Sequence, residues 1–148
     1  MARFLSKSDE QIIISAIKQA ELNTSGEIRV HIEPRCKAAT PEDRVKEVFT
    51  HLNMHKTALK NGVLIYVSVK DKNTAIWGDE GINKAVGQDF WDSELHVLLK
   101  HFREGDYAGG LSSAIESVGI KLKQHFPYQK DDVNELPDDI SYGDDDDA

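Results

Sequence analysis

The chain has 148 residues, which is enough for one domain with a real hydrophobic core. Nine of its 26 acidic residues, but only one of its 18 basic residues, lie from Pro127 onward, so the net charge of -8 belongs to the C-terminal tail. The rest of the chain is close to neutral and has no basic stripe, which argues against a nucleic-acid partner. The single cysteine, Cys36, excludes an intramolecular disulfide and a cysteine-rich zinc site.

The N-terminus carries no targeting signal that we can identify. Asp9 and Glu10 lie where a secretory signal peptide would have its apolar segment. No apolar run approaches the roughly 18 to 20 residues that are needed to cross a bilayer. The sequence therefore predicts no membrane span and a cytoplasmic location.

The first half of the chain predicts a helix, a strand and a second helix. A capping-box pattern at Ser8–Gln11 opens a helix that reaches about Leu22. Apolar and polar residues alternate over Glu27–Glu33, which is typical of a half-buried strand. Thr40, followed by a proline, is expected to cap a helix that ends near Met54.

The second half predicts a hairpin followed by three helices. The run Gly62–Val69 is apolar on both faces and suits a central strand that is covered by helices on both sides. The turn residues after it predict a return strand at Thr74–Trp77. A short helix over residues 82–86 follows. A longer helix is expected to be capped by Asp92 or Ser93 and to end at Gly105, and the last helix ends near Phe126.

This order predicts an α/β fold, a three-layer α/β/α sandwich with a small mixed sheet. The first two strands are expected to be parallel, with a right-handed crossover between them. Residues 1–126 form the single predicted domain. Residues 127–148 have too few apolar side chains to offset their ordering entropy, so a disordered acidic tail is expected there.

Carboxylates beside glycines mark a candidate cation site. Asp79 and Glu80 lie between Gly78 and Gly81, directly after a predicted strand, and Asp106 follows a glycine between two predicted helices. Calcium takes six to eight oxygen ligands, and loops of this kind supply them. The alternative is that Asp79 and Asp106 only cap the helices that follow them.

Several segments resemble the TPM domain family, and together they cover about residues 22–126. The matching segments are Ser25–Ile28, Asn61–Leu64, Gly78–Ile82, Phe102–Tyr107 and Gly109–Leu111. The resemblance implies an α/β/α sandwich with a divalent-cation site, usually for calcium, at the loop end of the sheet. Some members are described as acid phosphatases and others as assembly or repair factors. Many members have an aspartate where this chain has Lys60, and members commonly carry a secretion signal or membrane helix, neither of which is expected from this sequence.

The leading hypothesis is a TPM-like domain that binds a divalent cation, calcium first and magnesium second, and that has a binding or assembly role. Asp79 and Asp106 are the expected ligands, and the auxiliary candidates are Glu80, Glu27 and Asn61. The first alternative is a metal-assisted phosphomonoester hydrolase, for which Lys60 and Arg103 are the cationic candidates, either of which could hold a phosphate oxygen. The second alternative is a metal-free module that interacts with another protein.

Overall fold

The computed structural model describes residues 5–128 and 140–143. Its helices are α1 (Lys7–Glu21), α2 (Pro41–His51), the short 3-10 helix η1 (Met54–Lys56), α3 (Glu80–Val86), α4 (Gln88–Arg103) and α5 (Tyr107–His125). Its strands are β1 (Glu27–Glu33), β2 (Gly62–Ser68), β3 (Asn73–Gly78) and β4 (Ile140–Tyr142).

The four strands form one mixed sheet in the order β3-β2-β1-β4. Strand β1 pairs in parallel with β2, with Glu27 opposite Gly62 and Glu33 opposite Ser68. Strand β3 returns antiparallel to β2, and β4 lies parallel to the outer side of β1. The expected parallel pair and the expected hairpin are both confirmed.

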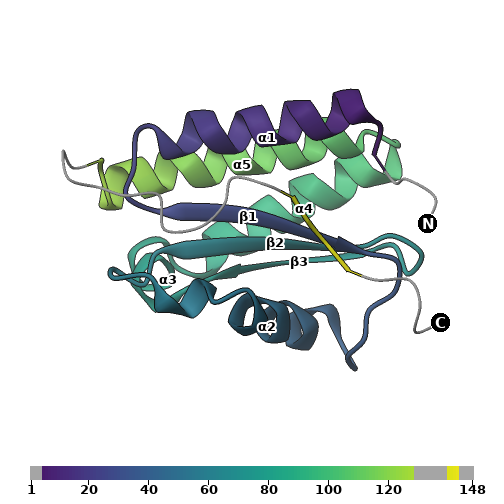
Figure 1. Cartoon of the computed structure of the whole chain (residues 1–148), viewed down its shortest axis with the longest axis horizontal. Coiled ribbons are helices and arrows are strands. Elements are labelled where there is room, and N and C mark those ends of the chain that lie inside the picture. The colour runs from purple at the N-terminus through teal and green to yellow at the C-terminus, as the bar shows by residue number, and fades with distance from the viewer. Residues whose placement is uncertain (1–4, 129–139, 144–148) are drawn as a thin grey trace.

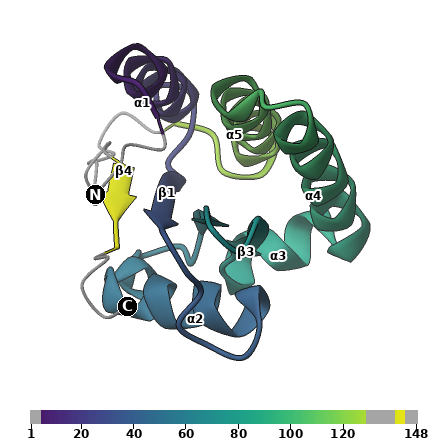
Figure 2. The same ribbon diagram turned by 90° about the vertical axis from the view of Figure 1, so that its right-hand side faces the viewer.

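Helices cover both faces of the sheet (Figures 1 and 2). Helices α1, α4 and α5 lie over one face and enclose the larger hydrophobic core, which includes Ile28, Val63 and Ile115. Helix α2 packs on the other face over a smaller core that contains Phe49 and Tyr66. The architecture is the predicted three-layer sandwich, and every residue of β2 is buried, as the run of apolar residues on both faces indicated.

Two helix starts differ from the prediction. Helix α1 is capped by Ser6, whose hydroxyl accepts a hydrogen bond from the Asp9 N–H, so the capping box lies two residues earlier than expected. Helix α4 begins at Gln88 instead of near Asp92, because Gly87 adopts a φ of 81° and turns the chain directly from α3 into α4.

The C-terminal segment contains structure that the sequence analysis did not expect. Residues 140–142 form β4, and Ile140 is buried against the larger core, so the expectation of a disordered tail is wrong for this segment. Residues 129–139 and 144–148 of that predicted tail lie outside the described residues. Within residues 5–128 and 140–143, no helix combines the length and the apolar character that a membrane span requires.

Candidate functional site

The candidate residues lie at two opposite edges of the sheet. Strands β1 and β2 begin at one edge, called here the amino edge, which is marked by Glu27 and Gly62. They end at the other edge, called here the carboxyl edge, which is marked by Glu33 and Ser68. Because β3 runs antiparallel, it begins at the carboxyl edge and ends at the amino edge.

The amino edge brings together three of the predicted site residues. Glu27 and Asn61 are both almost fully buried, and the Glu27 N–H donates to the Asn61 carbonyl. The Asn61 amide lies 3.4 Å from the Ser25 hydroxyl. Asp79 follows β3, and its N–H donates to the Gly62 carbonyl at 2.9 Å. The expectation that Glu27 and Asn61 are neighbours on the sheet rim is therefore met.

Asp79 caps helix α3, which is the structural role that the sequence offered as an alternative. Its Oδ1 accepts a hydrogen bond from the Glu80 N–H at 2.8 Å. Its Oδ2 is buried and has no hydrogen-bond partner among the described residues. The Glu80 side chain is exposed and points to Lys84 one turn later, so it does not join Asp79.

Asp106 also caps a helix, at the carboxyl edge. Its Oδ1 accepts a hydrogen bond from the Gly109 N–H at 3.1 Å in the first turn of α5. Its Oδ2 lies 3.0 Å from Nδ1 of His101. Both carboxylate oxygens are thus used to fix the junction between α4 and α5.

The structure contradicts the expected convergence of Asp79 and Asp106. Asp79 is hydrogen-bonded to the first residue of β2, whereas the residues on either side of Asp106 lie beside the last residues of that strand. A strand of seven residues separates them by roughly 20 Å. The prediction placed Asp79 and Asp106 together and did not account for the length of α4. The 16 residues of this helix carry the chain from one edge of the sheet to the other.

The two predicted phosphate-binding cations are separated in the same way. Lys60 lies in the loop before β2, at the amino edge, and its amine donates to the carbonyl of His55. Arg103 lies at the end of α4, at the carboxyl edge. One phosphate group cannot contact both side chains, and of the two candidates Arg103 lines a pocket.

A calcium ion does not fit the predicted ligand set as one shell. The part of the chain that the structure describes contains no group of three or more His, Cys, Asp or Glu side chains that could hold a metal ion. Of the two main candidates, Asp106 already has a hydrogen-bond contact at each oxygen, and Asp79 has one oxygen without such a contact among the described residues. A magnesium ion, which keeps several waters and needs only one or two carboxylates, is less demanding.

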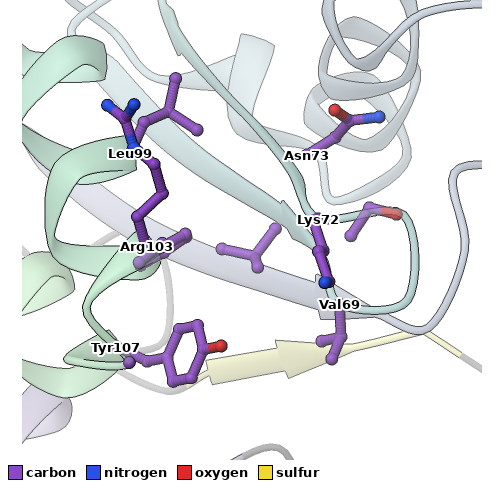
Figure 3. Close-up of a pocket in the computed structure, with 10 residues that line it drawn as sticks. Val69, Lys72, Asn73, Leu99, Arg103 and Tyr107 are labelled. Atoms are coloured by element: carbon purple, nitrogen blue, oxygen red, sulfur yellow. The ribbon is translucent and has the colours of Figure 1, made fainter.

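A pocket of about 340 Å³ opens at the carboxyl edge, between the β2–β3 hairpin and the end of α4 (Figure 3). In this view the side chain of Tyr107 points toward the hairpin, the side chain of Lys72 ends beside Val69, and Arg103 extends along α4 beside Leu99. The pocket is lined by Val67, Ser68, Val69, Lys72, Asn73, Leu99, Phe102, Arg103, Gly105 and Tyr107.

The lining of this pocket is positively charged. Lys72 and Arg103 both contribute to it, and no carboxylate does. Neither cation forms an ion pair with any residue of the described chain. The carboxylate of Asp71, next to Lys72 in the chain, accepts hydrogen bonds from the Cys36 N–H and the Ser68 hydroxyl. These two bonds lower the pKa of Asp71, the backbone bond contributing more.

A buried ionic network lies at the same edge, on the α2 face, and the sequence analysis did not identify it. The Glu33 carboxylate is inaccessible to solvent and is bonded by Arg44 from α2 and by the Tyr66 hydroxyl at 2.5 Å. His31 lies 3.4 Å from it. Burial opposes ionisation of Glu33, but the hydrogen bonds of His31, Arg44 and Tyr66 outweigh it and hold the pKa well below the ordinary value.

No sequence spacing signals this network. Glu33 and Arg44 are eleven residues apart on different elements, and Tyr66 comes from a strand that is read as purely apolar. Glu33 shares its strand face with Glu27, Arg29 and His31, so the alternation predicts a solvent-exposed position and gives no sign of the burial. Only the structure shows that this carboxylate is buried and therefore needs a partner.

Comparisons with known proteins agree with the fold. The family model of the TPM domain matches residues 1–120. The solved structure of BA42 protein from Bizionia argentinensis is 46% identical, covers 97% of this chain and 98% of its own, and has a TM-score of 0.88. The comparison with curated proteins gives no match.

Two more distant structures share the fold alone. An N-terminal domain from P. gingivalis is 21% identical, with 85% of this chain and 83% of that one covered and a TM-score of 0.68. The N-terminal domain of cg2496 protein from Corynebacterium glutamicum is 18% identical, with 80% and 74% covered and a TM-score of 0.64.

Proposed function

We propose that this chain, which belongs to the TPM domain family, binds a small organic anion, a phosphate monoester in particular, in the pocket at the carboxyl edge. The observation that carries the proposal is the pair Lys72 and Arg103, two cations without an ionic partner among the described residues, lining one cavity that has no carboxylate in its wall. An anion that reaches either side chain gains a favourable electrostatic interaction that no carboxylate of the pocket wall supplies.

The position of the pocket supports a binding role. In α/β sheets, ligands bind beyond the carboxyl ends of the parallel strands, because loops and helix ends there can be shaped freely. Ser68 is the last residue of β2, and Arg103 is the last residue of α4. The end of the sheet thus presents the pocket, with Lys72 in the β2–β3 turn and Arg103 at the end of α4.

The lining chemistry favours an organic ester over free phosphate. Val67, Val69, Leu99 and Phe102 give the pocket an apolar surface. The amide of Asn73 and the hydroxyl of Tyr107 add groups that can form directional hydrogen bonds. An apolar substituent on the phosphate would cover apolar surface of the pocket that stays exposed to solvent when inorganic phosphate binds.

Binding is proposed in place of turnover. Phosphomonoester hydrolysis needs a nucleophile or a metal-activated water beside the phosphate. The lining holds no Asp, Glu, His or Cys side chain, and the Ser68 hydroxyl already donates to Asp71. Release of phosphate from phenyl phosphate with added magnesium, lost in Arg103→Gln, would replace the binding role with the hydrolase alternative.

An amide chemical-shift titration tests the proposal. Phenyl phosphate should shift the amides of residues 69–73 and 103–107, and inorganic phosphate should shift the same amides at higher concentration. Shifts confined to other segments, or equal responses to the two compounds, would contradict a pocket of this chemistry.

A second candidate function is the binding of a divalent cation at the amino edge, and it is a separate proposal. The observation in its favour is the buried Oδ2 of Asp79, which has no hydrogen-bond partner in residues 5–128 and 140–143. Glu27 and Asn61 lie at the same edge and can order water around an ion. We propose a largely hydrated magnesium ion there in preference to calcium.

Titration with magnesium and calcium separates this candidate from nonspecific binding to the acidic tail. Binding at the amino edge shifts the amides of Asn61 and residues 78–82, leaves those around Asp106 unchanged and is lost in Asp79→Asn. Response of the tail residues alone would remove the candidate.

A further inference from the structure

The outer edge of β1 is paired at its start and along residues 30–32. At its start, the Ile28 N–H donates to the carboxylate of Glu21 at 2.8 Å. Further along, β4 pairs with residues 30–32, and the Gly143 N–H donates to the Ile32 carbonyl at 2.7 Å. Because unpaired edge strands attract other strands, this edge is protected by α1 at one end and by residues 140–143 at the other.

Residues 140–143 sit between two walls with different chemistry. Ile140 is buried against the larger core, on the α1 side, and the Tyr142 hydroxyl lies 2.7 Å from the Glu10 carboxylate. On the α2 side, the Ser141 hydroxyl lies 2.9 Å from Nδ1 of His31. The alternation of a strand therefore matches an apolar side and a polar side of one groove.

On the polar side of the groove, position 143 has room only for glycine. A Cβ atom at Gly143 would lie 2.5 Å from the Cβ of Glu33 and 2.7 Å from its Oε1. The Glu33 side chain cannot move aside, because its carboxylate accepts hydrogen bonds from Arg44 and Tyr66. The buried ionic network thus forms the end of the groove, and it leaves room at position 143 only for a residue without a side chain.

The family match includes the edge of β1 but does not reach the strand that covers it. The family model covers residues 1–120, which include all of β1, His31 and Glu33. Strand β4 lies beyond that match, at residues 140–142. The edge of β1 therefore lies within the matched residues, whereas its covering strand lies beyond them.

We infer that the edge of β1 is a peptide-binding groove, and that residues 140–143 are its internal ligand. The partner that fits is an extended segment of another protein that adds to the sheet in parallel to β1. Its four consecutive residues are an aliphatic residue, a residue with a hydroxyl group, any residue and glycine. Main-chain hydrogen bonds give such a complex its affinity, and the alternate side chains give it specificity. The attached segment keeps the groove closed until such a partner competes with it.

A Gly143→Val chain opens the groove without shortening the protein. The matched control is Tyr142→Phe, which removes only the hydroxyl contact with Glu10. The probe is a synthetic peptide of residues 137–146, and a second peptide carries valine at the position of Gly143. Amide hydrogen exchange on β2 and α5 reports whether each variant keeps its core fold.

The expected result is that the glycine peptide shifts the amides of residues 30–33 in Gly143→Val, with at least tenfold tighter binding than to wild type or Tyr142→Phe. The valine peptide should not bind. The inference is overturned if residues 140–142 keep their exchange protection in Gly143→Val. It is also overturned if the opened chain ignores the glycine peptide at millimolar concentration, binds both peptides alike, or self-associates through its own valine-bearing segment.

Discussion

Arg44 holds the buried carboxylate of Glu33 with two hydrogen bonds, from Nε to Oε2 at 2.9 Å and from Nη2 to Oε1 at 3.0 Å. The guanidinium belongs to α2 and the carboxylate to the end of β1, so the pair fixes α2 to the carboxyl edge of the sheet. The same pair forms the end of the groove that contains Gly143.

Removal of Arg44 is expected to be costly. Arg44→Met leaves the Glu33 charge buried without its main partner, and the free energy of unfolding should fall by about 3 to 5 kcal/mol. Glu47→Gln is the matched control, since it removes only the exposed partner of the same guanidinium and should cost under about 1 kcal/mol. Urea unfolding measures both. Equal losses in the two variants would contradict a structural role for the buried pair.

The Glu33 network also predicts how stability responds to acid. The pKa of Glu33 is lower in the folded chain than its ordinary value of 4.5. Its contribution is therefore complete above pH 4.5 and is lost as the pH falls from there toward the folded-state pKa. In Glu33→Gln, the free energy of unfolding should decline less steeply below pH 4.5 than in wild type. Parallel pH profiles of the variant and wild type would contradict a lowered pKa of Glu33 in the folded chain.

Asp106 is expected to matter as a helix cap. Asp106→Ala removes the acceptor for the Gly109 N–H and should lower the free energy of unfolding by about 0.5 to 2 kcal/mol. Asp106→Asn keeps an acceptor oxygen and should cost less. Thermal melts with chelator and with added calcium should give the same difference between the two variants. A difference that appears only with calcium would restore Asp106 as a ligand.

Gly143 provides a prediction about packing. Gly143→Ala places a methyl group within contact distance of the Glu33 side chain, so β4 should lose hydrogen-exchange protection while β2 keeps it. Gly105→Ala is the contrasting variant, because a Cβ there meets nothing within 4 Å and strain arises only from its φ of 77°. Unchanged protection of β4 in Gly143→Ala would contradict the close approach.

Local patterns were sufficient to predict most of the architecture. The alternation over Glu27–Glu33, the apolar run that begins at Gly62 and the threonine-proline cap at Thr40 each specify an element by neighbouring residues alone. Strand β4 was missed because three residues in an acidic context carry no periodic signal, and their order depends on the partner strand β1.

The candidate site was harder to predict because its residues meet only through tertiary structure. Sequence motifs grouped Asp79 with Asp106, although α4 separates them. The pocket cations Lys72 and Arg103 are 31 positions apart, in a turn and at a helix end, and neither position is distinctive by itself. The family resemblance gave the fold correctly, and coordinates were needed to see which charges share a cavity.

The most direct test of the account measures phenyl phosphate affinity in chains with Lys72→Gln, Arg103→Gln and the control Lys123→Gln, an exposed cation in the last turn of α5. Each pocket variant should weaken binding by about tenfold, with the loss reduced at high salt, and the control should match wild type. Equal affinity in all four proteins would contradict an anion site between the hairpin and α4.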